Sequence, residues 1–198
     1  MTRNAGGFIY WSFFLLALLA FSSCRSAKML SDASSAKNKE FKGTITERYS
    51  ALLGVRESEV KNTKLYRFID DWMGVPHLSG GTTKGGADCS GFTSVLQKEI
   101  YGLSVPRTAK DMAEFVKRKF EGELKEGDLV FFDFNGRKFN HVGVYLQNSR
   151  FVHVSTSKGV IVSNLKDSWY YKYFSRCGTV VEDSRGTNAS KSNYQAKP

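Results

Sequence analysis

The spacing of apolar residues changes at Gly127, and this change restricts the folds that the chain can adopt. Before Gly127, apolar residues recur every three or four positions, as they do on helices that bury one face. After Gly127, short runs of β-branched and aromatic residues alternate with polar turn-forming segments, which is typical of strands. A block of helices followed by a block of strands predicts an α+β domain, with the N-terminal helices packed on a small antiparallel β-sheet.

Three helices are expected in the first block. They cover 62–73, 89–101 and 109–116. Gly74-Val75-Pro76 ends the first helix, and Thr108 is a suitable N-cap for the third. The loop before the second helix contains four glycines, but it lacks the Gly-Lys-Ser/Thr ending of a phosphate-binding loop. The second helix is therefore expected to begin at Cys89, directly after a glycine-rich loop.

Five strands and one short helix are expected in the second block. The strands cover 129–134, 141–145, 150–154, 160–163 and 179–181, and the helix covers 169–174. Turn formers fill 146–150, so the second and third strands are expected to pair as a hairpin. Side chains two positions apart share one face of a strand, which groups His141 with Gly143 and His153 with Phe151. The hairpin is therefore expected to bring the two histidines together.

One cysteine and two histidines form a candidate catalytic set. The unpaired N–H groups and the dipole at a helix N-terminus favour the thiolate of Cys89, which is the nucleophilic form. A base that deprotonates a thiol needs a third group that fixes its orientation. His141 is expected to be this base, and His153 is expected to orient it.

Other interpretations of the same residues stay open. Cys89 can be a small buried cysteine beside a capping Asp88, and the histidines can be ordinary half-exposed strand residues. A zinc site made of Cys89, His141 and His153 is the chemical alternative. It is the weaker one, because the chain has no short Cys-x-x-Cys or His-x-x-x-His pair. Neither a metal nor another cofactor is expected.

The first residues have the composition of an export signal. Arg3 precedes an apolar run of about 14 residues, and Ser22-Ser23-Cys24 follows it. The run is shorter than the stretch of about 20 residues that a membrane-spanning helix needs. Cleavage before Cys24 would leave this cysteine for acylation, as in bacterial lipoproteins, although Phe21 is not the usual small aliphatic residue. The alternative is an ordinary signal peptide with Cys24 in a flexible tail.

Composition divides the chain into four parts. Residues 1–23 are the expected signal peptide, and 24–59 are a polar tether with a short ordered piece near 49–55. The catalytic domain is expected over 60–182, which is long enough for one domain with its own core. Residues 183–198 are rich in Ser, Asn, Lys and Gly and are expected to be a disordered tail.

The three cysteines are consistent with this division. An exported chain that relies on disulfides more often has an even number of cysteines. If Cys24 carries lipid and Cys89 is catalytic, only Cys177 remains, and its apolar neighbours indicate a buried small residue.

The formal net charge is +10, which raises the question of an anionic partner. The export signal argues against nucleic acid, and the basic residues are scattered rather than interleaved with aromatic residues. Anionic cell-wall polymer or lipid head groups are the expected partners, and a merely soluble basic surface is the alternative.

Several motifs resemble those of the NlpC-type cell-wall cysteine peptidases, a compact papain-like family. They are Asp88-Cys89-Ser90-Gly91-Phe92, Pro106-Arg107, Gly127-Asp128-Leu129-Val130-Phe131-Phe132, His141-Val142-Gly143-Val144-Tyr145 and Phe151-Val152-His153. They occur between about 65 and 181 in the order and spacing of the family. The stretches 65–69 and 155–160 are similar to those of lipid-anchored Spr-type murein endopeptidases.

The resemblance implies a role for each site residue. Cys89 would be the nucleophile, His141 the base and His153 the third polar residue. Asp88 and Ser90 would bind the peptide stem of peptidoglycan and can hold its free amino end. Twelve residues before the cysteine, where the family usually has a tyrosine, this chain has His77. A histidine can still donate a hydrogen bond, so His77 is a candidate oxyanion donor.

The predicted function is a cell-wall cysteine endopeptidase that hydrolyses amide bonds in peptidoglycan stem peptides or cross-links. It is expected to be monomeric, lipid-anchored through Cys24 and periplasm-facing in a bacterial cell envelope, with no nucleic-acid partner. An amidase or acyltransferase acting on another envelope substrate is one alternative, because a fold does not determine a function. A non-catalytic wall-binding domain is the other.

Overall fold

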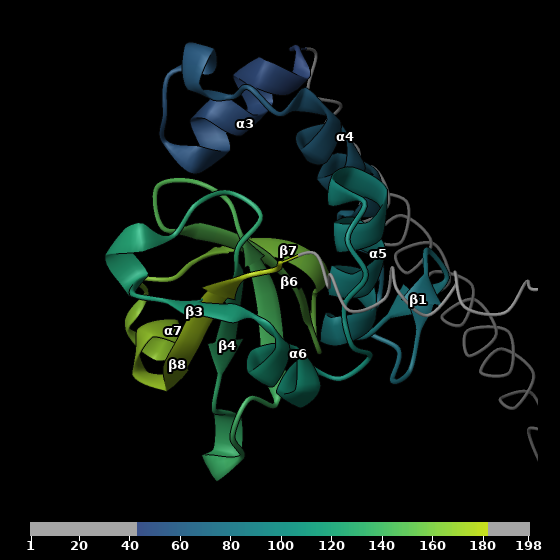
Figure 1. Cartoon of the computed structure of the whole chain (residues 1–198). Helices are drawn as coiled ribbons and strands as arrows, with labels where there is room; N and C mark the ends of the chain where they lie inside the picture. The colour runs from purple at the N-terminus through teal and green to yellow at the C-terminus, as the bar shows by residue number, and fades with distance from the viewer. Residues whose placement is uncertain (1–42, 182–198) are drawn as a thin grey trace, which may run out of the picture. The chain divides into compact units, whose positions relative to one another are not determined.

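The computed structural model describes residues 43–181, where helices pack against one antiparallel sheet (Figure 1). The predicted signal peptide, Cys24 and the predicted tail at 183–198 lie outside the described residues. Within 43–181, no helix combines the length and the apolar character needed to cross a membrane.

The three predicted N-terminal helices are present close to their expected bounds. The helices are α3 (Ile45–Leu53), α4 (Thr63–Trp72), α5 (Cys89–Tyr101), α6 (Ala109–Phe115) and α7 (Ser168–Tyr173), with 3-10 turns η1 (Glu57–Glu59), η2 (Glu121–Glu123) and η3 (Phe134–Gly136). Each predicted helix begins at a side-chain cap: Asn62 for α4, Asp88 for α5 and Thr108 for α6 accept a bond from a backbone N–H of the first turn. Because each cap is a local interaction, the starts of these three helices could be predicted from the sequence.

Helix α3 lies within the segment that was expected to be a tether. Thr44 and Glu47 form a capping box at its start, and Tyr49 and Leu53 are buried in the main core. Tyr49 also packs on Tyr66 of α4, with 4.8 Å between ring centroids. The folded part therefore begins well before residue 60, and the ordered piece expected near 49–55 overlaps this helix, which ends at Leu53. The polar composition of 24–59 concealed a nine-residue helix with only two buried side chains.

The sheet has six strands, and every neighbouring pair is antiparallel. The strands are β3 (Lys117–Lys119), β4 (Leu129–Phe132), β5 (His141–Tyr145), β6 (Arg150–Ser155), β7 (Gly159–Asn164) and β8 (Phe174–Thr179), in the order β3-β8-β4-β5-β6-β7. A separate two-stranded ribbon, β1 (Thr82–Thr83) and β2 (Gly86–Ala87), forms in the glycine-rich loop before α5. The predicted α+β architecture and the β5–β6 hairpin are confirmed.

One predicted strand extends too far, one is misplaced and one strand was not predicted. The strand expected over 129–134 ends at Phe132, because Phe134 begins the 3-10 turn η3. The last strand is β8, over Phe174–Thr179, rather than 179–181. It begins directly after α7, so the predicted helix at 169–174 extended into it. Strand β3 was not predicted, because Lys117, Arg118 and Lys119 carry no apolar alternation. Pairing with β8 creates this edge strand, and charged residues are common at sheet edges.

Both faces of the sheet are covered. On β4, Leu129 and Phe131 belong to the core shared with α3, α4, α5 and α6, whereas Val130 and Phe132 belong to a second cluster on the opposite face. Tyr170 and Tyr173 of α7 pack on this second cluster. Burial on both faces explains why β4 is a continuous apolar run, and it places α7 on the face to which the hairpin histidines point.

Candidate active site

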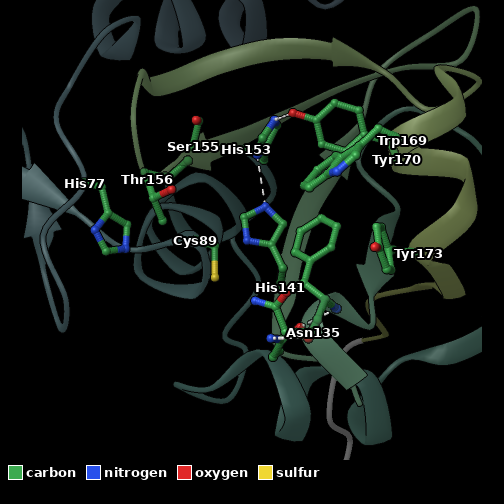
Figure 2. Close-up of a pocket in the computed structure, with 13 residues that line it drawn as sticks. His77, Cys89, Asn135, His141, His153, Ser155, Thr156, Trp169, Tyr170 and Tyr173 are labelled. Carbon is green, nitrogen blue, oxygen red and sulfur yellow. Dashed lines mark hydrogen bonds between the residues drawn. The ribbon is translucent and has the colours of Figure 1, made fainter. Parts of the chain in front are cut away.

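A cavity of about 430 Å³ brings together all three histidines of the chain and one cysteine (Figure 2). Its polar lining includes His77, Cys89, Asn135, Asn140, His141, His153, Ser155 and Thr156, and its aromatic lining consists of Phe134, Trp169, Tyr170 and Tyr173. The predicted set of Cys89, His141 and His153 therefore converges in one place, although its members come from α5, β5 and β6.

Cys89 is the first residue of α5. The carboxylate of Asp88 accepts a hydrogen bond from the Gly91 N–H at 2.6 Å and caps the helix. The Cys89 side chain lies between His77 and His141 (Figure 2). The side chain is half-buried, so the thiol lines the cavity without being fully open to water.

Burial changes the acidity of Cys89 in the direction opposite to the prediction. Burial raises the pKa of the Cys89 thiol, while a backbone N–H of Val142 lowers it and the charge of Asp88 raises it again. The helix N-terminus alone was expected to favour a thiolate, but desolvation outweighs it. In the free protein the thiol is therefore protonated near neutral pH, and a base must accept its proton during attack.

The two hairpin histidines contact each other directly. His141 Nε2 lies 3.0 Å from His153 Nδ1, and the rings are nearly perpendicular, at 84°. Gly143 makes this approach possible: a Cβ at this position would lie 2.7 Å from the Phe151 ring and 3.2 Å from His153 Cβ. The predicted pairing of His141 with His153 is confirmed as a contact.

Both imidazoles are neutral near neutral pH. Burial lowers the pKa of His141 to about 4, and His77 adds to the shift. Burial also lowers the pKa of His153 to about 3, with a further contribution from His141. A neutral ring carries one N–H and one bare nitrogen, so His141 can accept a proton from a neighbouring thiol.

The outer nitrogen of His153 has partners that the sequence did not predict. Its Nε2 lies 3.0 Å from Ser163 Oγ and 3.1 Å from Tyr170 Oη. Ser163 belongs to β7 and Tyr170 to α7. The predicted strand and helix contained both residues, but no local pattern shows which side chains meet across the sheet.

Arg107, from the Pro106-Arg107 motif, binds both Asp88 and Ser90, a contact that was not predicted. Arg107 donates to both Asp88 oxygens, at 3.0 and 2.8 Å, and to Ser90 Oγ at 2.9 Å. Burial acts to raise the pKa of Asp88, but Arg107 and the N–H groups of Gly91 and Gly80 bring it down to about 2. Neither Asp88 nor Ser90 lines the cavity. No local sequence signal pointed to this contact, because Arg107 lies 19 positions after Asp88.

His77 lines the cavity from the loop before α5 and is exposed. Backbone bonds on both sides hold it in place: Leu78 N–H donates to Ala87 O, and Ala87 N–H donates to Pro76 O, both at 3.1 Å. The position assigned to an oxyanion donor therefore lies beside the predicted nucleophile.

Two further expectations concern Cys177 and the alternative of a zinc site. Cys177 is free and buried in β8, as predicted. Among residues 43–181, no group of three or more His, Cys, Asp or Glu side chains is arranged to hold a metal ion.

Comparison with known families agrees with this geometry. A model of the NlpC/P60 family matches residues 74–179, which include Cys89, His141 and His153. The chain belongs to the NlpC/P60 family. The predicted family and its papain-like fold are thereby confirmed.

Two curated NlpC/P60 relatives have informative names. A probable endopeptidase NlpC homolog from Haemophilus influenzae is 37% identical over 136 residues, covering 69% of this chain and 68% of the relative. The murein DD-endopeptidase MepS/murein LD-carboxypeptidase from Escherichia coli strain K12 is 38% identical over 130 residues, covering 66% of this chain and 68% of the relative. The match therefore spans about two thirds of the length of each relative.

Solved NlpC/P60 structures show the same fold. An NlpC/P60 family protein from Bacillus cereus superposes with a TM-score of 0.54 at 25% identity, covering 58% of this chain and 38% of that one. A lipoprotein-like NLP/P60 family protein from Staphylococcus aureus superposes with a TM-score of 0.54 at 25% identity, covering 60% of this chain and 41% of that one. The chain thus corresponds to about two fifths of each of these longer proteins.

Proposed function

We propose that this protein is a cysteine endopeptidase that hydrolyses amide bonds in the peptides of peptidoglycan. The observation that carries the proposal is the convergence of Cys89, His141 and His153 in one cavity, with the two imidazoles in contact. Relatives named as endopeptidases, at 37% and 38% identity, support the activity, and one of them is named for murein.

The reaction begins with a neutral thiol and a neutral imidazole. His141 accepts the thiol proton while the Cys89 sulfur attacks the amide carbonyl. When the tetrahedral intermediate collapses, the C–N bond breaks and His141 gives its proton to the leaving amine. A water molecule then attacks the thioester with His141 as base, which releases the carboxylic acid and restores the thiol. No other reactant is consumed.

Digestion of purified peptidoglycan tests the proposal and its alternatives. With the full chain, mass spectrometry is expected to show fragments with a new amino end and a new carboxyl end inside a stem peptide or a cross-link. Release of ammonia or transfer of an acyl group, without such fragments, would favour an amidase or acyltransferase. Binding to the polymer with no change in mass would indicate a wall-binding protein and would refute the proposal.

The developing oxyanion needs hydrogen-bond donors near the sulfur. We assign the backbone N–H of Cys89, at the start of α5, and the side chain of His77. Binding of a free amino end of the substrate by Asp88 and Ser90 stays a prediction, because Arg107 already occupies their oxygens in this structure.

Replacing His77 is expected to lower kcat with little change in KM. One side-chain donor to an oxyanion contributes roughly 2.7–4 kcal/mol at most, and a donor that shares the work with a backbone N–H contributes less. His77→Tyr is expected to keep or raise activity, because a phenol offers the same kind of donor. Steady-state kinetics of the Ala and Tyr variants on one defined muropeptide measure this. An unchanged kcat in His77→Ala, or equal loss in both variants, would exclude His77 as a donor.

We also propose that the protein is anchored in a bacterial cell envelope through lipid on Cys24. The support is the apolar run that ends in Ser22-Ser23-Cys24. Arg25 and Lys28, with no acidic residue beside them, favour a periplasm-facing anchor.

Cys24→Ser is expected to remove the acyl mass and to release the protein from the membrane fraction. Intact-mass spectrometry and fractionation of cells that express the full chain measure both effects. Cys177→Ser, which changes a buried cysteine far from the N-terminus, is the matched control and is expected to stay membrane-bound. An unmodified Cys24 in the mature wild-type protein would contradict the proposal.

A further inference from the structure

His153 is bonded at both ring nitrogens and closed off from water. Only 2% of it is exposed, its Nδ1 contacts His141, and its Nε2 contacts two hydroxyls. Those hydroxyls are also joined to each other, because Ser163 Oγ donates to Tyr170 Oη at 3.2 Å. Neither Ser163 nor Tyr170 has a part in the reaction as described so far.

The role of His141 as base sets the position of every proton in this chain of contacts. Figure 2 shows that the second ring nitrogen of His141, Nδ1, faces the side of Cys89. Nδ1 must be bare to accept the thiol proton, so the single N–H of neutral His141 must be at Nε2. That N–H donates to His153 Nδ1, which must then be bare as well. The N–H of His153 must therefore be at Nε2, and it needs an acceptor.

We propose that Ser163 and Tyr170 are positioning residues that hold His153 in its Nε2–H tautomer and thereby keep His141 in the form that can accept the Cys89 proton. The direction of the hydroxyl contact supports this role. Because Ser163 directs its own hydrogen to Tyr170, an oxygen lone pair of Ser163 is available to the His153 N–H. The inference rests on the proposed function, since it explains how that site is set for catalysis.

Within residues 43–181, the side chains packed around His153 offer its Nε2–H no hydrogen-bond acceptor other than the two hydroxyls. Phe151 stacks on its ring, with 4.9 Å between centroids and 24° between planes, and Tyr170 packs edge-on at 5.3 Å. A buried N–H that loses its acceptor is costly, so removal of both hydroxyls favours the Nδ1–H tautomer. That tautomer donates to His141 Nε2 and moves the His141 proton to Nδ1, where it faces the thiol. Two donors then face each other, and the base is lost.

The chain has only three histidines, which allows the tautomers to be measured directly. The full chain is labelled with 15N-histidine, and NMR distinguishes protonated from bare ring nitrogens at neutral pH. Wild type is expected to show Nε2–H for both His141 and His153. In Ser163→Ala/Tyr170→Phe, His153 is expected to shift toward Nδ1–H. The kcat on a defined muropeptide is expected to fall about 10- to 100-fold, by analogy with the loss of the outer partner of a metal-bound imidazole.

Further variants separate positioning from structure. Tyr171→Phe removes a hydroxyl from the same helix, where it donates to Glu121 instead, and is expected to leave both readouts unchanged. Ser163→Thr keeps the hydroxyl and is expected to retain the wild-type tautomer and kcat. Tyr170→Phe alone is expected to shift His153 part of the way toward Nδ1–H and to lower kcat less than the double variant does, because one acceptor is lost and Ser163 no longer has the partner that receives its hydrogen. These two single variants also give the comparison if the double variant does not fold.

Several results would overturn the inference. One is Nδ1–H on His153 in the wild-type protein, and another is a fall in kcat in the double variant with unchanged tautomers. A changed tautomer with wild-type kcat would equally refute a positioning role. If wild type cleaves no peptidoglycan but shows both Nε2–H tautomers that shift in the double variant, the proposed function fails while the tautomer control by Ser163 and Tyr170 stands.

Discussion

Cys89→Ala is expected to abolish release of peptides from peptidoglycan while the domain stays folded. In the proposed mechanism the sulfur forms the covalent bond to the substrate, and among residues 43–181 no other thiol lines the cavity. Loss of a nucleophile that acts together with its base lowers turnover by about 10⁴-fold or more. The start of α5 is held by the Asp88 cap, which does not involve the Cys89 side chain, so the stability cost is expected to be only about 1 kcal/mol.

The measurement pairs muropeptide turnover with thermal unfolding of the same samples. Cys177→Ala is the matched control, because it removes a free cysteine from β8, away from the cavity. It is expected to keep its activity, although it leaves a small buried void. Wild-type turnover by Cys89→Ala would refute the assignment of the nucleophile, and equal loss in both variants would indicate a structural effect.

His141→Ala is expected to lower kcat/KM by about 10²- to 10⁴-fold, because the base and the later acid are removed together. The same role predicts how the activity of the wild-type protein changes with pH. Protonated His141 cannot accept the thiol proton, and burial lowers its pKa from 6.5 to about 4. Wild-type activity is therefore expected to persist below pH 6 and to fall as the pH drops through about 4. The variant is expected to lack this acid limb.

Profiles of kcat/KM against pH for wild type and His141→Ala, recorded with the fold monitored by circular dichroism, measure both effects. Lys158→Ala, on the exposed β6–β7 turn, is a suitable control and is expected to keep the wild-type profile. A wild-type acid limb near the ordinary imidazole pKa would mean that His141 is solvated during catalysis. An acid limb that persists in the variant would assign the titration to another group.

Local sequence was sufficient for most elements and for the core of the candidate site. Asp88 and Thr108 are side chains whose capping bonds span only three residues, so the starts of α5 and α6 could be predicted. The β5–β6 hairpin depends on a short turn and on alternation of period two, which are also local. Together these placed Cys89 at a helix start and brought His141 to His153.

Contacts between distant segments could not be predicted in this way. Arg107 reaches Asp88 across 19 positions, and His153 meets Tyr170 across 17 positions. Helix α3 is ordered because Tyr49 and Leu53 enter a core made by the rest of the domain. Each contact depends on which faces the packed elements present to one another, and sequence periodicity does not encode that.

The sequence by itself determined most of the elements, the hairpin and the choice of Cys89, His141 and His153 as candidates, because capping and side-chain alternation act over a few positions. Only the tertiary structure decided the protonation of the site. Desolvation depends on everything packed around a group, and it raises the pKa of Cys89 and lowers that of His141. The helix dipole, which can be inferred from sequence, is outweighed by this burial. The mechanism therefore starts from a neutral pair.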